Sequence, residues 1–152
     1  MICFLDFDGV LHPQALDAPI PAEKEFCHLG ALEALLREFP QVLVVISSSW
    51  RETVEMPVLV ALFSEDIQPR IIGATPTAGP DPYGKGHVSR EDEIRAWLTA
   101  NGGLDQLWVA LDDLEHQFVR HCDRLVACDR GTGLDERSFA ELRQHFERAA
   151  AL

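Results

Sequence analysis

The 152-residue sequence has no long uninterrupted run of apolar residues. Its longest aliphatic run covers residues 42–46, and a longer apolar stretch at residues 56–63 is broken by a proline. Neither approaches the ~18 apolar residues of a membrane-spanning helix. The N-terminus has no basic segment, and two aspartates interrupt its apolar stretch, which argues against a secretory signal peptide. We therefore expect a cytoplasmic protein without membrane partners.

Positive charge is also scarce, with 13 lysines and arginines against 25 aspartates and glutamates and a net charge of −12. No cluster of basic residues stands out, so the sequence offers no obvious surface for nucleic-acid phosphates. The excess of carboxylates suits a hard divalent cation. The four cysteines include no C-x-x-C pair. Cys3 and Cys128 lie in apolar runs, where reduced thiols serve as small core residues.

Internal repeats, low-complexity tracts and long linkers are absent as well. The length is that of one ordinary domain, and a composition of 47% hydrophobic and 25% charged residues is typical of a globular protein. We expect residues 1–152 to form a single domain.

Short apolar runs alternate with longer amphipathic ones along the chain. The pattern predicts strands at residues 2–5, 42–46, 71–72, 107–111 and 125–128, and helices at residues 23–39, 57–63, 89–102 and 138–149. Strands that alternate with helices imply a parallel sheet covered on both faces. The predicted fold class is therefore α/β, a three-layer, doubly wound parallel sheet.

Polar side chains gather where three of these strands end. Asp6, Asp8 and Gly9 follow the first strand, serines 47–49 follow the second, and the acids 112–113 follow the fourth. The carboxyl ends of parallel strands share one edge of the sheet, where doubly wound folds bind ligands. Each acid alone could simply terminate a strand. Several carboxylates at one edge repel one another, and a bound Mg²⁺ together with substrate phosphate would relieve that repulsion.

These motifs resemble those of the haloacid dehalogenase (HAD) superfamily. Residues 6–11 (D-F-D-G-V-L) are similar to its first motif, residues 44–48 to its second, and residues 111–113 to its fourth. Within the superfamily, the chain resembles the small HAD domain of Swiss-Army-knife RNA-repair proteins, through residues 48–51, 73–76, 93–98 and 133–134. The resemblance covers essentially the whole chain and implies a Rossmannoid HAD-like fold.

The resemblance also implies a phosphatase that works through an aspartyl-phosphate. Asp6 would be the nucleophile, and Asp8 the general acid that later becomes a base. Mg²⁺ would bind the Asp6 carboxylate, the Asp8 backbone carbonyl, and Asp112 or Asp113.

Two further roles each have two candidates under the resemblance. A hydroxyl that donates to the phosphoryl group is expected from Ser47 or Ser48, with the alignment favouring Ser48. The cation of the third motif is expected from Arg90 or Lys85, with Arg90 favoured because it precedes the Glu-Ile pair of the subfamily pattern.

Several neighbours of these motifs have open interpretations. Gly9, Ser49 and Arg51 are the expected substrate-binding residues, although Arg51 could instead pair with a surface acid. Trp50 could stack on a base or sugar or could pack in the core. His12 could lie at the rim of the site or could be an ordinary turn residue.

The segments at residues 12–22 and 52–89 are too short for a full cap domain, so the site should be open to a metabolite, a phosphoprotein or a polymer end. A nucleic-acid-end substrate follows from the resemblance alone, and the net charge of −12 weighs against it. Two other functions are a phospho-accepting signalling module like a receiver domain, and a phosphate-binding or metal-binding domain with little turnover. The sequence does not indicate an oligomeric state.

Overall fold

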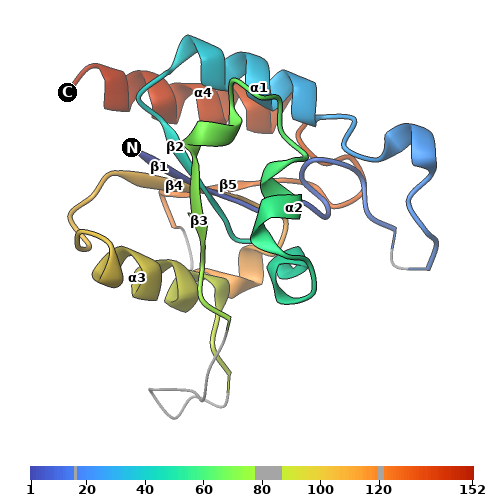
Figure 1. The fold of residues 1–152 in the computed structure, drawn as a ribbon, viewed down its shortest axis with the longest axis horizontal. Coiled ribbons are helices and arrows are strands. Elements are labelled where there is room, and N and C mark those ends of the chain that lie inside the picture. The colour runs from blue at the N-terminus through green and yellow to red at the C-terminus, as the bar shows by residue number, and fades with distance from the viewer. Residues whose placement is uncertain (16, 78–86, 120–121) are drawn as a thin grey trace.

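A computed structural model describes residues 1–15, 17–77, 87–119 and 122–152. Its centre is one parallel sheet of five strands in the order β3-β2-β1-β4-β5 (Figure 1). The strands are β1 (Ile2–Leu5), β2 (Leu43–Ile46), β3 (Ile71–Ala74), β4 (Trp108–Asp112) and β5 (Leu125–Ala127). The predicted α/β class and parallel sheet are confirmed.

Burial explains why the inner strands carry apolar residues on both faces. All four residues of β1 and all five of β4 are buried, because helices cover the sheet from both sides. One set of side chains packs against α1 (Leu29–Glu38), α2 (Met56–Val60) and α4 (Glu136–Ala150), while the alternate set packs against α3 (Arg90–Ala100). Figure 1 shows α1 and α4 on one side of the sheet and α3 on the other.

The order of the strands determines where a site can form. From β1 the chain proceeds through β2 to β3 on one side, and α3 then carries it back across to β4 on the other side of β1. The ends of β1 and β4 therefore flank the point at which the winding direction changes. Doubly wound folds bind ligands at such a point.

The helix predicted at residues 23–39 begins later than expected. Residues Ala22–Lys24 form one turn of 3₁₀-helix, and α1 begins only at Leu29. Between them Phe26 adopts a φ of 53°, which interrupts a regular helix. The predicted helix at residues 57–63 is also wrong in length, because α2 ends at Val60.

The other helix starts follow the local sequence. The helix predicted from residue 89 begins with a capping box, in which the Ser89 hydroxyl accepts from the Asp92 N–H and the Asp92 carboxylate accepts from the Ser89 N–H. Asp135 and Ser138 form a second capping box, so α4 begins at Glu136 rather than at Ser138.

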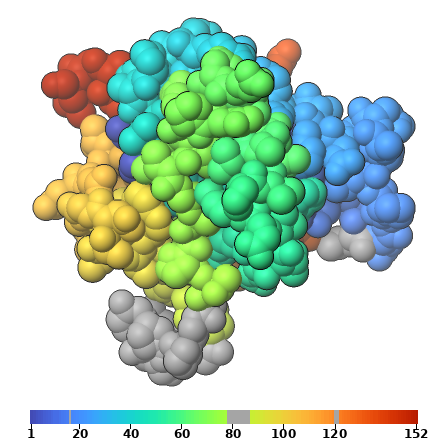
Figure 2. Space-filling model, in the orientation of Figure 1, coloured from blue at the N-terminus to red at the C-terminus, as the bar shows by residue number. Residues whose placement is uncertain are grey.

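The described parts of the chain contain no cap domain over this edge of the sheet. Between β1 and α1 lies a loop with one 3₁₀-turn, and Figure 2 shows this segment, in blue, projecting from one side of the molecule. Between β2 and β3 lie α2 and the 3₁₀-turns Ser49–Glu52 and Gln68–Arg70. No helix within the described residues has the length and hydrophobicity needed to cross a membrane.

Candidate active site

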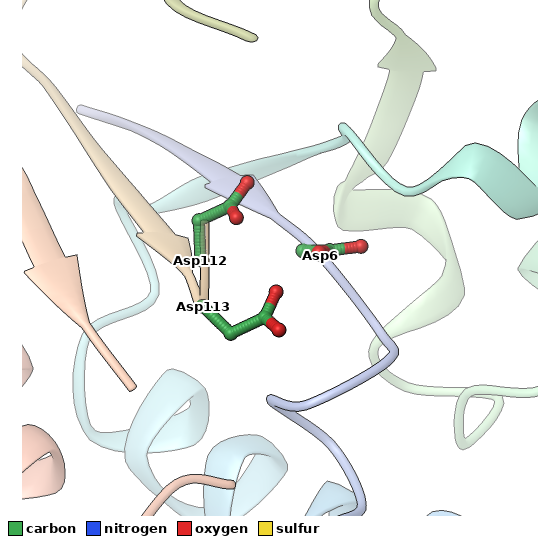
Figure 3. Close-up of side chains that lie close together, drawn as sticks. All are labelled: Asp6, Asp112 and Asp113. Carbon is green, nitrogen blue, oxygen red and sulfur yellow. The ribbon is translucent and has the colours of Figure 1, made fainter. Parts of the chain in front are cut away.

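Three carboxylates meet at the carboxyl ends of β1 and β4. Asp6 follows β1, Asp112 is the last residue of β4, and Asp113 comes next in the chain. Each offers a carboxylate oxygen, and these oxygens all lie within 4.8 Å of one another (Figure 3). Asp6 is 3% exposed and Asp112 is 1% exposed. Acids that follow separate strands, which the sequence predicted to share one edge of the sheet, therefore lie close together in the structure.

Backbone donors hold two of these acids in place. The Phe7 N–H donates to Asp6 Oδ1 at 2.8 Å, and the Leu114 N–H donates to Asp112 Oδ1 at 2.8 Å. The Asp6 N–H itself donates to the carbonyl of Leu111 at 3.0 Å, which ties the residue to β4. Fixed main-chain donors orient both carboxylates without occupying all of their oxygen lone pairs.

Arg130 anchors the third acid. Its Nε donates to Asp113 Oδ2 at 2.8 Å, and the Asp113 side chain is only 2% exposed. Sequence reasoning missed Arg130, because a partner 17 residues away in a loop leaves no periodic signal.

The shared burial of these acids raises the pKa values of two of them. Loss of hydration raises the pKa of Asp6 to about 8, with repulsion from Asp112 adding to the rise and Arg90 opposing it. Burial raises the pKa of Asp112 to about 6. A divalent cation would favour both ionised forms, and an all-oxygen donor set is what Mg²⁺ prefers. The residues present therefore fit a magnesium ion.

Gly9 permits the close approach of the first-motif loop to this cluster. Its φ is +71°, and a Cβ at this position would lie 2.6 Å from Asp113 Oδ2. A side chain here would therefore meet both backbone strain and a steric clash with a cluster carboxylate.

Arg90, the first residue of α3, points into the cluster. Its Nη1 lies 3.6 Å from Asp6 Oδ1 and 3.5 Å from Asp112 Oδ2, and it also donates to the backbone carbonyl of Ser47. Its side chain is 12% exposed. The other candidate for this cationic role, Lys85, lies outside the described residues.

The two candidate serines differ in what their hydroxyls contact. The Ser48 Oγ accepts from the Trp50 N–H at 3.3 Å and caps the 3₁₀-turn that follows. The Ser47 Oγ is buried and has no hydrogen-bond partner within the described part of the chain. A buried hydroxyl without a partner is costly, and a ligand oxygen would supply one. The geometry thus favours Ser47, whereas the sequence alignment favours Ser48.

Strand register aligns the site residues in one row. Leu5 pairs with Ile46 on one side and Leu111 on the other, so the next residues, Ser47, Asp6 and Asp112, follow at one level. Thr75 continues this row beyond β3, since Ala74 pairs with Ile46, and its Oγ1 is likewise buried without a partner among the described residues.

Asp8 lies beside the cluster and is held by two side chains. His12 Nε2 lies 2.9 Å from Asp8 Oδ1, and the Trp50 Nε1–H donates to Asp8 Oδ2 at 3.1 Å. Hydrogen bonding by His12 lowers the pKa of Asp8, and Trp50 adds to that effect. Sequence reasoning considered His12 and Trp50 separately and missed that both contact Asp8.

Two of the predicted substrate-binding residues, Arg51 and Ser49, differ in how far they are buried. The Arg51 guanidinium donates to the backbone carbonyls of Thr75 and Ser48 at 2.9 and 2.8 Å, and to Glu93 Oε2 at 2.7 Å. Its side chain is 5% exposed, and these contacts join the 3₁₀-turn that holds Arg51 to neighbouring segments inside the protein. Ser49 is exposed at the start of the 3₁₀-turn.

Comparison with known proteins gives one match. The family described as the HAD domain in Swiss Army Knife RNA repair proteins matches residues 2–139 of the chain. No curated protein and no solved structure matches the chain.

Proposed function

Because the chain belongs to the family of HAD domains in Swiss Army Knife RNA repair proteins, we propose that it is a Mg²⁺-dependent phosphatase with Asp6 as nucleophile. Family membership supports a HAD-type hydrolase in general. The observation that carries the finer proposal is the meeting of Asp6, Asp112 and Asp113 around one point, with Arg90 beside them. A phosphoryl group needs such a combination of nucleophile, cation and metal-binding acids.

The proposed reaction gives Asp6 and Asp8 separate roles. A carboxylate oxygen of Asp6 forms a bond to phosphorus while the bond to the leaving-group oxygen breaks, and Asp8 in its protonated form gives its proton to that oxygen. In the second half, Asp8 takes a proton from water, whose oxygen attacks phosphorus and releases phosphate from Asp6. Asp6 is thereby regenerated and Asp8 is protonated for the next cycle.

The surrounding residues stabilise charge during these steps. Asp6, the Asp8 backbone carbonyl, and Asp112 or Asp113 would hold a Mg²⁺ ion, which would supply the positive charge that an anionic nucleophile needs to approach an anionic phosphate. Arg90 adds a fixed guanidinium next to Asp6. The Ser47 hydroxyl, which has no partner among the described residues, donates to a phosphoryl oxygen. This assignment of Ser47 over Ser48 predicts that Ser47→Ala lowers kcat/KM more than Ser48→Ala does.

The substrate class is proposed from access and from family. The described residues place no cap over the site, so a phosphate at the end of a larger molecule can reach Asp6. The family description names RNA repair, which favours a terminal phosphate of RNA as the substrate. The net charge of −12 supports the competing possibility, a small phosphorylated metabolite.

The test is hydrolysis of p-nitrophenyl phosphate by purified protein with Mg²⁺ or with EDTA. We expect turnover with Mg²⁺ only, and a loss of at least about 10³-fold in Asp6→Asn. Asp105→Asn removes an exposed acid just before the amino end of β4, at the opposite edge of the sheet from Asp6, and serves as the matched control. Mass spectrometry of acid-quenched protein should find the phosphoryl group on Asp6 of the wild type.

Other outcomes separate the alternatives. Substantial turnover by Asp6→Asn would exclude this nucleophile. Binding of Mg²⁺ and phosphate without turnover of aryl, nucleotide-end or metabolite phosphates would instead identify a phosphate-binding domain. A stable phosphoryl group on Asp6 would indicate a signalling module.

A further inference from the structure

His12 is fully buried next to Asp8, and its surroundings define which ring nitrogen carries the proton. The Phe26 backbone N–H donates to His12 Nδ1 at 3.2 Å, so Nδ1 is the acceptor. In the neutral ring the hydrogen then sits on Nε2, which lies 2.9 Å from Asp8 Oδ1 and donates to it. One backbone donor thereby sets the tautomer that suits the carboxylate.

Trp50 binds the other oxygen of the same carboxylate. Its indole N–H donates to Asp8 Oδ2 at 3.1 Å. The indole ring packs edge-on against Phe7 and Phe26, with ring centroids 5.8 and 5.4 Å apart. The aromatic contacts restrict the ring, so the N–H direction is fixed before a substrate arrives.

Phe26 takes an unusual conformation to complete this arrangement. Its φ of 53° is the one positive value at a non-glycine residue in the described chain. Such a conformation is unfavourable for a bulky residue and persists only where the surroundings enforce it. Here it directs the Phe26 N–H to His12 and places the Phe26 ring 5.0 Å from the imidazole.

We propose that His12 and Trp50, with the Phe26 backbone N–H behind His12, are positioning residues that hold the Asp8 carboxylate in its orientation for proton transfer. This inference rests on the proposed function, in which Asp8 exchanges a proton with the leaving group and then with water. Two carboxylate oxygens offer about four acceptor positions, of which these contacts use two. The remaining acceptor positions stay available for proton transfer while the Asp8 side chain is held in one rotamer.

The geometry is tested first, without reference to activity, by NMR of protein labelled with ¹⁵N in histidine and tryptophan. We expect His12 as the neutral Nε2–H tautomer, and a Trp50 indole N–H that exchanges slowly with solvent. Asp8→Ala should shift both signals and speed that exchange. The Trp108 indole, at the opposite end of β4, should not respond.

The role is tested by leaving-group dependence with two substrates of similar shape. Phenyl phosphate releases a basic phenolate that needs a proton, and p-nitrophenyl phosphate releases one that does not. For Trp50→Phe and His12→Leu we expect kcat/KM to fall about 10-fold or more with phenyl phosphate and less than about 3-fold with p-nitrophenyl phosphate. His12→Gln, which retains a donor, should recover part of the loss, and Trp108→Phe should behave like wild type with both substrates.

The outcomes separate failure of this inference from failure of the proposed function. Equal losses with both substrates would overturn the positioning role, because a structural defect does not discriminate between leaving groups. An Asp8→Ala variant that leaves the His12 and Trp50 signals unchanged would overturn the contacts themselves. If NMR finds the contacts in the wild type but neither substrate turns over with Mg²⁺, the proposed function is overturned. The positioning role then fails with it.

Discussion

Buried charges occur in two parts of this protein, and their surroundings differ sharply. On the helices, both carboxylate oxygens of Glu33 accept from Ser64, at 2.7 and 2.6 Å. Both oxygens of Glu91 are also bound, one by Arg95 at 2.6 Å and the other by the Val119 N–H at 2.7 Å. Each acid has a donor for each oxygen, which compensates for the hydration lost on burial.

The acids at the edge of the sheet lack that degree of compensation. Asp6 and Asp112 share the guanidinium of Arg90 at 3.6 and 3.5 Å, distances longer than a hydrogen bond. Asp113 adds a third carboxylate within reach of both. The helix acids stabilise the fold, whereas the sheet-edge acids cost stability that a bound cation can restore. Buried charges with incomplete partners therefore mark the functional part of this chain.

The largest effect on stability is expected from Arg51→Ala. The substitution would remove the ion pair between Arg51 and the Glu93 carboxylate, which is 8% exposed, and the side-chain hydrogen bonds that Arg51 donates to the carbonyls of Thr75 and Ser48. Removing one partner of a buried ion pair costs about 3–5 kcal/mol of unfolding free energy. Urea unfolding of the wild type and the variant at pH 7 measures this loss.

Arg143→Ala is the matched control, because Arg143 forms a bidentate pair with Glu38 on the surface. We expect a much smaller change there, since water replaces an exposed partner. A loss in Arg51→Ala as small as that in Arg143→Ala would show that Arg51 contributes little to stability, and its predicted role in substrate binding would then be the better explanation of its position.

The next largest effect is the dependence of metal-free stability on pH. The pKa of Asp6 rises on folding from 3.8 to about 8, so the folded state binds the proton more tightly than the unfolded state does. Stability from this group is complete below pH 4 and is lost as the pH rises toward 8. The pKa of Asp112, raised to about 6, adds loss over the lower part of that range.

Asp6→Asn isolates this contribution. The low pKa of the half-buried His145 has the opposite effect on the pH dependence, but it is common to both proteins. Between pH 5 and pH 8 in EDTA, the wild type should lose on the order of 4 kcal/mol relative to Asp6→Asn. Mg²⁺ at 100 times its Kd should return about 2.7 kcal/mol to the wild type at pH 8. If the stability of the two proteins depended on pH in the same way without Mg²⁺, the pKa of Asp6 would not be raised in the folded protein.

Sequence reasoning succeeded where the signal was local. The strands at residues 2–5 and 107–111 are apolar runs bounded by polar residues, and the capping box at Ser89 is a four-residue pattern. The start of α1 could not be predicted, because the positive φ of Phe26 accompanies a hydrogen bond to His12, which lies 14 residues earlier.

The same distinction holds at the site. Asp6 and Asp112 could be placed together because parallel strands bring their carboxyl ends to one edge. The contact of Trp50 with Asp8 spans 42 residues and depends on the direction of one indole N–H. The enclosure of Arg51 by backbone carbonyls is similar, since carbonyl directions leave no trace in residue identity.

The smallest expected effects on stability come from alanine substitutions at two glycines, and the two substitutions should act in opposite directions. Gly9→Ala places a methyl group 2.6 Å from Asp113 Oδ2 at a φ of +71°, so we expect a loss of about 1–2 kcal/mol and weaker Mg²⁺ binding. Gly30→Ala adds the same methyl group within α1, where nothing lies within 4 Å, and should gain about 0.5–1 kcal/mol. Thermal unfolding and Mg²⁺ titration of both variants measure the difference. If Gly9→Ala retained full Mg²⁺ affinity, the Asp113 carboxylate would not be a ligand, and Asp6 with Asp112 would have to bind the metal without it.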